Sequence, residues 1–430
     1  MFEQLFSLKS HNTTIKQEVI AGLTTFLTMA YIIFINPAML ADAGMDHGAV
    51  FVATCLAAAI GCFVMGFLAN YPIALAPGMG LNAFFTYTVV LEMGYTWQVA
   101  LGGVFISGIL FIILSLFRIR EWIINSIPHT LRMGIAVGIG LFLAFIGLKN
   151  AGIVVDNPAT LVDLGDITAI GPLLSALGLF LIVALTTRKV NGAVMISIIV
   201  ITVIGLLIGD IEYNGVVSMP PDIAPTFMQL DILGATEVGM ISVIFAFLFV
   251  DLFDTTGTLV AVAQKGGLLA KDNSFPRLGK ALMADSTATV AGSILGTSTT
   301  TSYVESTAGV AAGGRTGLTA VVVGLLFVLA IFFAPLASMV PAYATAGPLF
   351  FVAVLMLSSL KNIDWDNLLD AVPATLICIT MPLTFSIAHG IALGFISYAA
   401  VRVFSGKFSQ LSISVSIIAL LFVVKFIYFG

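Results

Sequence analysis

Four acidic side chains interrupt stretches of sequence that otherwise consist of apolar or small residues. They are Asp251 and Asp254 in FLFVDLFDTTGTLVAVA, Asp285 in ALMADSTATVAG, and Glu305 in TSYVESTAGVAAGG. A charged group at the centre of a lipid bilayer costs roughly 3 kcal/mol or more, so such residues are rare unless a substrate, an ion or a proton requires them. Any one of them could instead stay protonated or form a hydrogen bond between helices. Four in one short stretch of chain indicate a functional site.

The composition is that of a membrane protein. Hydrophobic residues make up 59% of the 430 positions and charged residues only 9%, compared with about 25% charged residues in an average protein. This excludes a water-soluble fold, and nucleic acid is not expected as a partner. Cys55, Cys62 and Cys378 lie in apolar runs without metal-ligand spacing, so neither a metal site nor a cofactor is expected. The polar N-terminus shows no removable signal peptide.

Hydropathy predicts fourteen membrane spans of about 20 residues, the length that crosses roughly 30 Å of hydrocarbon. The first seven are 17–42, 48–70, 72–92, 96–116, 124–148, 168–186 and 192–209. The next seven are 236–264, 281–297, 299–314, 316–338, 344–360, 369–387 and 389–404. The acidic, proline-containing segment 210–235 is predicted to be the longest loop. A last apolar segment, 411–429, could cross the membrane, lie along its surface or pack against a partner subunit.

The positions of lysine and arginine support this assignment of spans. If the N-terminus is cytoplasmic, most of them fall in the cytoplasmic connections, as the positive-inside rule requires. The residues that fit are Lys9, Lys16, Arg118, Arg120, Arg188, Lys189, Lys265, Lys271, Arg277, Lys280, Arg315, Lys361, Arg402 and Lys407. Lys149, beside an outer loop, is an exception.

Seven spans per half is an odd number, so a repeated half would enter the membrane in the opposite orientation. Many secondary transporters use such inverted repeats to build access from both sides to one central site. Two weak sequence matches support a repeat. FLTMAYIIFINPAML in the first span resembles FLFVDLFDTTGTLV in the eighth, which places Asn36 near the counterpart of Asp254. NGAVMISII at 191–199 resembles HGIALGFIS at 389–397.

Two segments are predicted to be broken rather than regular helices. PIALAPGMGLNAFFTY, at 72–87, contains several glycine and proline residues, and GTSTTTSYVESTAGVAAGG, at 296–314, begins with β-branched and hydroxyl residues. Each could form a short strand followed by a half-helix. Irregular backbone within a membrane is tolerated where protein or a cavity satisfies its polar groups, and a matched pair of such segments points to a transporter's binding site. The alternative is a glycine-rich helix that packs closely against its neighbours.

The eighth span places several polar groups on one side of a helix. Asp251, Asp254 and Thr258 are spaced by three and four residues, with Thr255 beside them, and this face is expected to point inward. A carboxylate accepts hydrogen bonds and, when protonated, also donates one. Two carboxyl groups on facing elements could therefore hold a planar, uncharged heterocycle. A cation site would need more oxygen ligands than so apolar a chain supplies.

The chain resembles the AzgA-like purine permeases of the nucleobase-ascorbate transporter (nucleobase-cation symporter-2) family over residues 12–405. The motifs that carry the resemblance are INPAML at 35–40, APGMGLNAFF at 76–85, FVDLFDTTGTL at 249–259, ALMADS at 281–286, TSTTTSYVESTAG at 297–309, GGRTGLTA at 313–320 and MPLTFSIAHGIALGFISY at 381–398. The resemblance implies an all-α polytopic membrane protein with a 7+7 inverted repeat and short strands in spans 3 and 10. It further implies a homodimer in the cytoplasmic (inner) membrane that takes up adenine, guanine or hypoxanthine with protons, by elevator-like alternating access.

The implied organisation has a core domain of spans 1–4 and 8–11 and a gate domain of spans 5–7 and 12–14. The boundaries are 12–120 (core), 121–210 (gate), 211–338 (core) and 339–405 (gate), followed by a C-terminal apolar helix at 406–430.

The resemblance also implies a substrate site. Asp254 takes the place of the carboxylate of the eighth span that holds the base, and Glu305 takes the place of the second one. The full predicted substrate-binding set is Asp254, Glu305, Tyr303, Val304, Asn82, Ala83, Thr258 and Asn36, with backbone groups expected around Asn82 and Ala83. Thr258 departs from the uracil-permease pattern, which has a histidine there. The proton carrier is therefore left open among Glu305, Asp251 and Asp285.

Other classes of function fit less well. An anion transporter of the same 7+7 fold is the main alternative, although Asp254 and Glu305 would repel an anion. A channel would need a repeated selectivity filter or a ring of acidic residues. No GxxxxGK[ST] phosphate loop is present, and no constellation of nucleophile and base suggests an enzyme.

Overall fold

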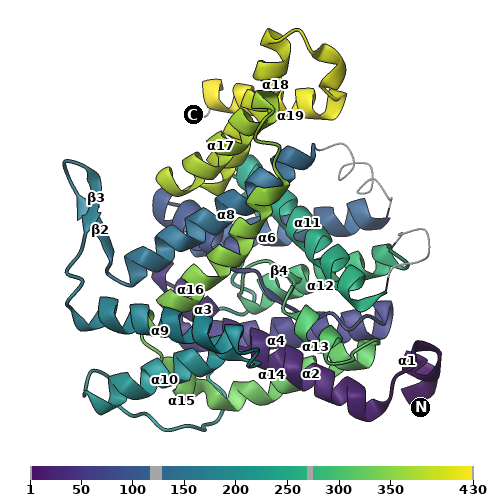
Figure 1. Cartoon of the computed structure of the whole chain (residues 1–430), viewed down its shortest axis with the longest axis vertical. Coiled ribbons are helices and arrows are strands. Elements are labelled where there is room, and N and C mark those ends of the chain that lie inside the picture. The colour runs from purple at the N-terminus through teal and green to yellow at the C-terminus, as the bar shows by residue number, and fades with distance from the viewer. Residues whose placement is uncertain (1, 117–127, 269–274, 429–430) are drawn as a thin grey trace.

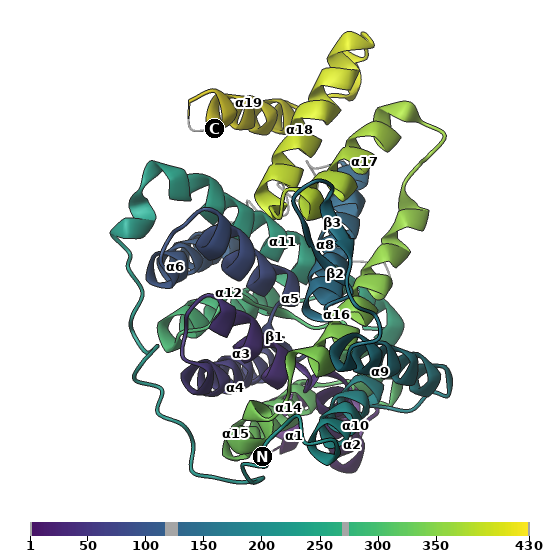
Figure 2. The same ribbon diagram turned by 90° about the vertical axis from the view of Figure 1, so that its left-hand side faces the viewer.

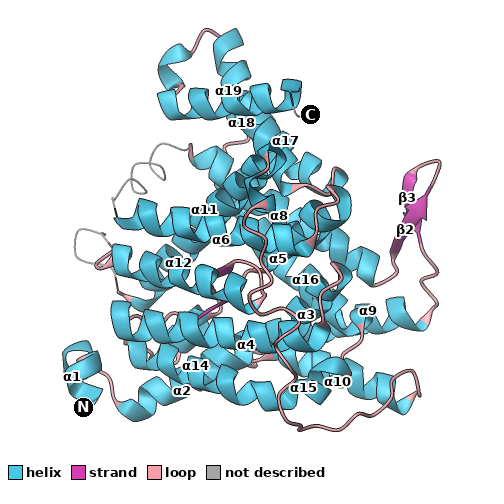
Figure 3. Ribbon diagram, turned by 180° about the vertical axis from the view of Figure 1, so that it is seen from behind, coloured by secondary structure: helices cyan, strands magenta, loops and turns pink. Residues whose placement is uncertain are grey.

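The computed structural model describes residues 2–116, 128–268 and 275–428 (Figure 1). Helices dominate this part of the chain, with four short strands among the described residues (Figure 3). Nine of the described helices are long and apolar enough to cross a membrane. This is the expected outcome for an apolar chain, because lipid offers no partners for backbone N–H and C=O groups and a helix satisfies them internally.

Each predicted span corresponds to a helix or to a strand followed by a helix. The elements before the long loop are α1 (Phe2–Phe6), α2 (Ile15–Met29), α3 (Ile32–Asp42), α4 (His47–Val64), β1 (Leu75–Pro77), α5 (Met79–Ala83), α6 (Trp97–Leu116), α8 (His129–Asn150), β2 (Val154–Asn157), β3 (Leu161–Leu164), α9 (Ile170–Thr187) and α10 (Ala193–Leu207). Two π-helical segments, Met65–Ala69 and Phe84–Glu92, extend α4 and α5.

The elements after the long loop follow the same pattern. They are α11 (Val238–Gly266), α12 (Leu278–Leu295), β4 (Thr300–Ser302), α13 (Ser306–Ala311), α14 (Gly317–Ala330), α15 (Ala334–Ser338), α16 (Ala342–Leu357), α17 (Leu368–Leu383), α18 (Ile387–Phe404) and α19 (Ile413–Tyr428). The first four residues of the predicted fifth span, 124–127, and the predicted cytoplasmic residues Arg118, Arg120 and Lys271 lie outside the described residues.

The helices form two groups that pack mainly within themselves. In one group α4 packs against α12 and α14, and α6 packs against α11 and α12. In the other, α8 packs against α16 and α17, and α9 packs against α10 and α16. Figure 2 shows α17 and α18 towards one end of the molecule and α2 and α14 towards the other. The first group contains both broken segments.

The buried side chain of Glu18 connects the first span to α14 through hydrogen bonds. Its side chain is fully enclosed, and its carboxylate accepts hydrogen bonds from the backbone N–H groups of Arg315 and Thr316, at 2.9 and 3.2 Å, and from the Thr319 hydroxyl at 2.6 Å. A carboxylate at a helix N-terminus satisfies N–H groups that have no partner within the helix. Glu18 therefore stabilises the fold, whereas the carboxylates of the eighth and tenth spans are candidate site residues.

The first span is divided in two, which the sequence analysis did not predict. Helix α2 ends at Met29 and α3 begins at Ile32. Between them the N–H groups of Ile33 and Phe34 bond to the carbonyls of Ala30 and Tyr31, three residues back, at 3.1 Å each. Such bonds tighten the helix locally into a 3₁₀ turn. Tyr31 lies at this break, and its side chain projects from the first span there.

A hairpin between α8 and α9 was also missed. Strands β2 and β3 pair in register from Val154 opposite Leu164 to Asn157 opposite Leu161. Asn157 stabilises the turn, because its side-chain oxygen accepts hydrogen bonds from the N–H groups of Ala159 and Thr160. The β-branched residues in 153–162 favour an extended chain. From the sequence, only a connection between the spans 124–148 and 168–186 was predicted here.

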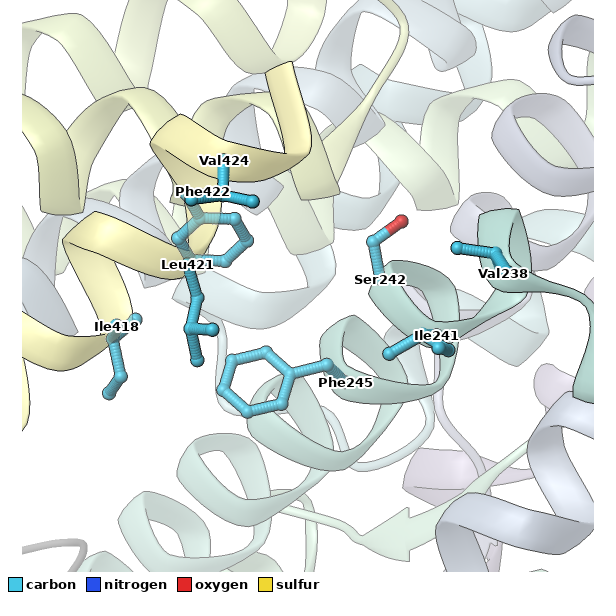
Figure 4. A pocket seen from close by; sticks show the side chains of 8 residues that line it. All are labelled: Val238, Ile241, Ser242, Phe245, Ile418, Leu421, Phe422 and Val424. Atoms are coloured by element: carbon cyan, nitrogen blue, oxygen red, sulfur yellow. The ribbon is translucent and has the colours of Figure 1, made fainter. Parts of the chain in front are cut away.

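The terminal helix α19 packs on its own subunit. The ring of Phe422 lies 6.0 Å from that of Phe245 in α11 and 6.2 Å from that of Phe395 in α18, between ring centroids. Beside these contacts α19 and the first turns of α11 leave an apolar groove between them (Figure 4). Its lining residues are Val238, Ile241, Ser242, Phe245, Ile418, Leu421, Phe422 and Val424. Helix α19 therefore bridges the two groups of helices.

Candidate functional site

Two strands from distant parts of the chain meet at the centre of the candidate site. Strands β1 and β4 are antiparallel and buried, with Leu75 opposite Ser302 and Pro77 opposite Thr300. The pairing continues beyond them, since the N–H of Tyr303 bonds to the carbonyl of Ala74 at 2.9 Å and that of Gly78 to the carbonyl of Thr299 at 3.0 Å. The pairing provides hydrogen-bond partners for backbone N–H and C=O groups of both broken segments. The prediction of short strands in spans 3 and 10 is confirmed.

Each strand leads directly into a half-helix. Helix α5 follows β1 after Gly78, and α13 follows β4 after Glu305. Because the strands are antiparallel, the two half-helices begin at opposite ends of the strand pair. Gly78 allows a close approach here, since an added Cβ would lie 2.8 Å from the hydroxyl oxygen of Thr301. A larger residue would push Thr301 out of place.

The two predicted substrate carboxylates lie together beside this strand pair. Asp254 of α11 lies close to the side chain of Thr301 on β4 and interacts electrostatically with Glu305. The hydroxyl of Tyr31, at the break in the first span, donates a hydrogen bond to Oε1 of Glu305. Tyr31 and Tyr303 both lie within electrostatic range of the two carboxylates. Three separate elements thus contribute to one acidic cluster.

This cluster is accessible on one side. Asp254 and Gly257 on α11 are exposed, and Glu305 is partly exposed. An added Cβ at Gly257 would meet no atom within 4 Å, so this face of α11 borders open space. Val304 adds an apolar side chain that is 45% exposed. The site therefore offers two carboxylates and an apolar surface to a small molecule.

Asp251 belongs to a second group, which is buried. The hydroxyl of Thr255 lies 2.7 Å from an oxygen of Asp285 and 3.3 Å from one of Asp251, and the hydroxyl of Ser302 lies 3.4 Å from Asp285. Asp251 is 2% exposed and Asp285 is fully buried. Of the residues expected on one inward face of α11, Asp251 is therefore buried beside Thr255, whereas Asp254 is exposed beside Glu305.

Asn36 and Asn82 hold the chain that leads into β4 and do not form part of the carboxylate cluster. Both amide hydrogens of Asn36 are used, in bonds of 2.7 and 2.8 Å to the hydroxyls of Thr54 and Thr297. The side-chain oxygen of Asn82 accepts a hydrogen bond from Ser298. Both asparagines are fully buried. Each positions the segment before β4 with one part of its amide, while the oxygen of Asn36 and the amide nitrogen of Asn82 have no hydrogen-bond partner in the described part of the chain.

The backbone groups predicted around Asn82 and Ala83 lie inside helix α5. The N–H of Asn82 bonds to the carbonyl of Gly78 at 2.8 Å, within α5. Ala83 is fully buried in the same helix. In a helix that begins at Met79, the N–H groups without a partner inside the helix belong to the first turn. Any backbone donors of this half-helix would therefore come from residues 79–81.

The other predicted residues lie close to the cluster. The hydroxyl of Tyr303 donates to the carbonyl of Pro77 at 2.5 Å, so this tyrosine locks β4 onto β1. Thr258 is partly exposed, one turn beyond Asp254. Tyr31 was missed by the sequence analysis. The available signal was a hydroxyl-bearing ring in the apolar run MAYIIF, and nothing in the sequence identified its partner.

The helical fold, the paired broken segments and the accessible carboxylates define a polytopic membrane protein of the transporter class. The chain belongs to the permease family (Xan_ur_permease), which it matches over residues 16–393. It is therefore a transporter and not an enzyme. Escherichia coli (strain K12) adenine permease AdeP is 52% identical over 428 residues, covering 100% of this chain and 96% of the relative. Bacillus subtilis (strain 168) guanine/hypoxanthine permease PbuG is 49% identical over 436 residues, covering 99% and 98%.

Solved structures of anion transporters share the fold. The transmembrane domain of a cyanobacterium bicarbonate transporter, BicA, superposes with a TM-score of 0.67 at 16% identity, covering 87% of this chain and 97% of that one. Murine Slc26a9 in the inward-facing state gives a TM-score of 0.67 at 12% identity, covering 91% and 69%. Similarity at these identities concerns the fold and says nothing of the substrate.

Proposed function

We propose that this protein carries purine nucleobases, namely adenine, guanine or hypoxanthine, across the cytoplasmic membrane. The observation that carries the proposal is the pair of accessible carboxylates, Asp254 and Glu305, set beside the β1–β4 strand pair. The names of close relatives, an adenine permease and a guanine/hypoxanthine permease that align over nearly the whole chain, support the substrate class.

The chemistry of the site suits an uncharged heterocycle. A purine presents ring N–H and exocyclic amino groups at its edge, and ionised carboxylates accept hydrogen bonds from such donors. The exposed side chain of Val304 offers an apolar contact for the flat ring. An anion would meet two negative groups instead. Although the fold is shared with anion transporters, this site therefore favours a neutral base over an anion.

The proposal includes fourteen spans arranged as a 7+7 inverted repeat. The antiparallel pairing of β1 in span 3 with β4 in span 10 is the relation that two inverted repeats would produce. We propose that the two groups of helices form a core domain (12–120 and 211–338) and a gate domain (121–210 and 339–405), followed by the C-terminal apolar helix at 406–430, and their packing mainly within themselves supports this division. We further propose a cytoplasmic N-terminus, a homodimer, and an elevator-like movement of the core against the gate.

Proton coupling is part of the same proposal, with Glu305, Asp251 and Asp285 as candidate carriers. The hydroxyl of Thr255 has one hydrogen and lies near an oxygen of both Asp251 and Asp285. It can donate to only one of them at a time. Ser302 links this pair to β4, which leads to Glu305.

Competition for uptake tests the substrate class. In proteoliposomes that contain the purified protein, with the labelled purine well above its KM, unlabelled adenine, guanine or hypoxanthine at tenfold excess is expected to suppress uptake by about 90%, as simple competition predicts for similar affinities. Xanthine and uracil are expected to compete poorly. Liposomes without protein are the control. Equal competition by uracil would show that the purine assignment is wrong.

An imposed pH gradient tests the coupling. Because a carboxyl group gains a proton on the acidic side and loses it on the other, an acid-outside gradient is expected to drive accumulation without sodium. A protonophore should reduce accumulation to the equilibrium level, while exchange of labelled for unlabelled purine continues because it needs no net proton movement. Accumulation that requires sodium and ignores the pH gradient would contradict the proposal.

A further inference from the structure

The hydroxyl of Tyr31 is placed where it can control the second carboxylate of the site. Tyr31 lies at the break between α2 and α3, and its side chain is 1% exposed. Its hydroxyl donates to Oε1 of Glu305, a residue 274 positions later in the chain. Because the ring is enclosed, the hydroxyl has little freedom to find another partner. The bond therefore links the first span to the start of half-helix α13.

This bond determines how Glu305 can meet a substrate. A carboxylate has two oxygens, each able to accept hydrogen bonds. The phenol takes Oε1, which restricts the rotation of the carboxylate and leaves Oε2 for another donor. Glu305 is partly exposed whereas Tyr31 is buried. The buried tyrosine therefore binds Glu305 from within the protein, and a substrate can approach Glu305 from its exposed side. The Glu305 carboxylate is thus oriented as a hydrogen-bond acceptor before a ligand binds.

We propose that Tyr31 is a positioning residue of the base-binding site, which orients Glu305 so that Oε2 accepts a ring N–H of the purine. This inference rests on the proposed function. A glutamate side chain has many rotamers, and ordering it during binding weakens the affinity. Tyr31 removes this cost by ordering Glu305 beforehand. Other groups near Glu305 do not replace the bond: an ionised Asp254 has no hydrogen to donate, the Tyr303 hydroxyl donates to Pro77, and the backbone N–H of Glu305 belongs to the same residue and does not connect it to another span.

The test compares two conservative variants of the purified protein. Tyr31→Phe removes the hydroxyl that holds Glu305. Tyr71→Phe is the matched control, since Tyr71 is 2% exposed and its hydroxyl donates to the backbone carbonyl of Pro276 rather than to a carboxylate. Binding of adenine, guanine and hypoxanthine is measured by calorimetry. The Kd of Tyr31→Phe is expected to rise about tenfold, the effect of disordering one long side chain, and that of Tyr71→Phe to stay within twofold.

Two further measurements separate positioning from a general structural role. In transport assays Tyr31→Phe is expected to raise KM about tenfold, with Vmax within about twofold, because ground-state binding is what changes. Singly N-methylated purines identify the N–H that meets Glu305 as the one whose loss weakens wild-type binding most. That penalty should shrink in Tyr31→Phe, since a disordered carboxylate discriminates less.

Each outcome separates the two proposals. A wild-type protein that binds none of the three purines would overturn the proposed function itself. A wild-type protein that binds, with Tyr31→Phe binding equally well, would overturn only the role of Tyr31. If Tyr31→Phe melts well below Tyr71→Phe, 3-fluorotyrosine at position 31 retains the ring and provides a more acidic donor. A changed purine Kd at unchanged melting temperature then supports the inference, and an unchanged Kd contradicts it.

Discussion

Replacement of Glu305 by glutamine, or of Asp254 by asparagine, is expected to reduce purine uptake at least about 100-fold while the protein stays folded in the membrane. Each change preserves the shape of the side chain but replaces a charged acceptor by a neutral amide. Hydrogen bonds to charged groups contribute about 1.5–3 kcal/mol, and a misplaced amide donor adds the cost of an unsatisfied contact. Uptake of labelled purine into cells with matched expression measures the effect.

Glu237→Gln is the matched control for these variants, because Glu237 precedes the same helix α11 but lies exposed and makes no side-chain cap there. Its uptake is expected to match the wild type. Membrane abundance and melting temperature distinguish lost transport from lost folding. Near-normal uptake by Glu305→Gln or by Asp254→Asn would exclude that residue from the site.

Replacement of Arg402 by leucine is expected to destabilise the protein by about 3 kcal/mol, because it leaves the carboxylate of Asp370 without its cation. Arg402 is 3% exposed and binds Asp370 at 2.7 Å and the carbonyl of Leu369 at 2.7 Å. Its guanidinium also lies 3.4 Å from the ring centroid of Tyr398. The value is at the lower end of the range for buried ion pairs, because the Asp370 side chain keeps 18% exposure. The measurement is the melting temperature of the purified protein in detergent.

The double variant Asp370→Asn with Arg402→Leu provides the control for this prediction. It removes both charges, so it should be less destabilised than Arg402→Leu alone. If the double variant melts at or below the temperature of the single variant, then the loss arises from packing around Arg402 and not from the stranded carboxylate.

Local sequence patterns predicted the structure correctly where the surrounding lipid constrains the chain directly. The thickness of the hydrocarbon layer sets the length of a helix that crosses it. In lipid, the backbone N–H and C=O groups must form hydrogen bonds with each other, because no water is available. Every predicted span therefore contains a helix or a strand with its half-helix. The glycine, proline and β-branched residues of 72–87 and 296–314 weaken a helix on their own, so both broken segments were also predictable.

The same analysis could not decide the direction in which a side chain points. The spacing of Asp251 and Asp254 is compatible with a shared face, yet a small rotation of α11 buries one beside Asp285 and exposes the other beside Glu305. The two asparagines fit a binding role by sequence, but the amide nitrogen of Asn36 holds Thr297 and the amide oxygen of Asn82 holds Ser298. Burial of a polar group demands a partner, and which partner it finds depends on neighbouring helices.

The sequence by itself thus determined the membrane-spanning class, the two broken segments and the candidate carboxylates Asp254 and Glu305. Only the tertiary structure decided that β1 pairs with β4, that Tyr31 reaches Glu305 across 274 residues, and that Asp251 is buried while Asp254 is exposed. The physical reason is that hydropathy and backbone propensity act within a few residues, whereas a hydrogen bond across the protein exists only once packing has brought its two groups within about 3 Å.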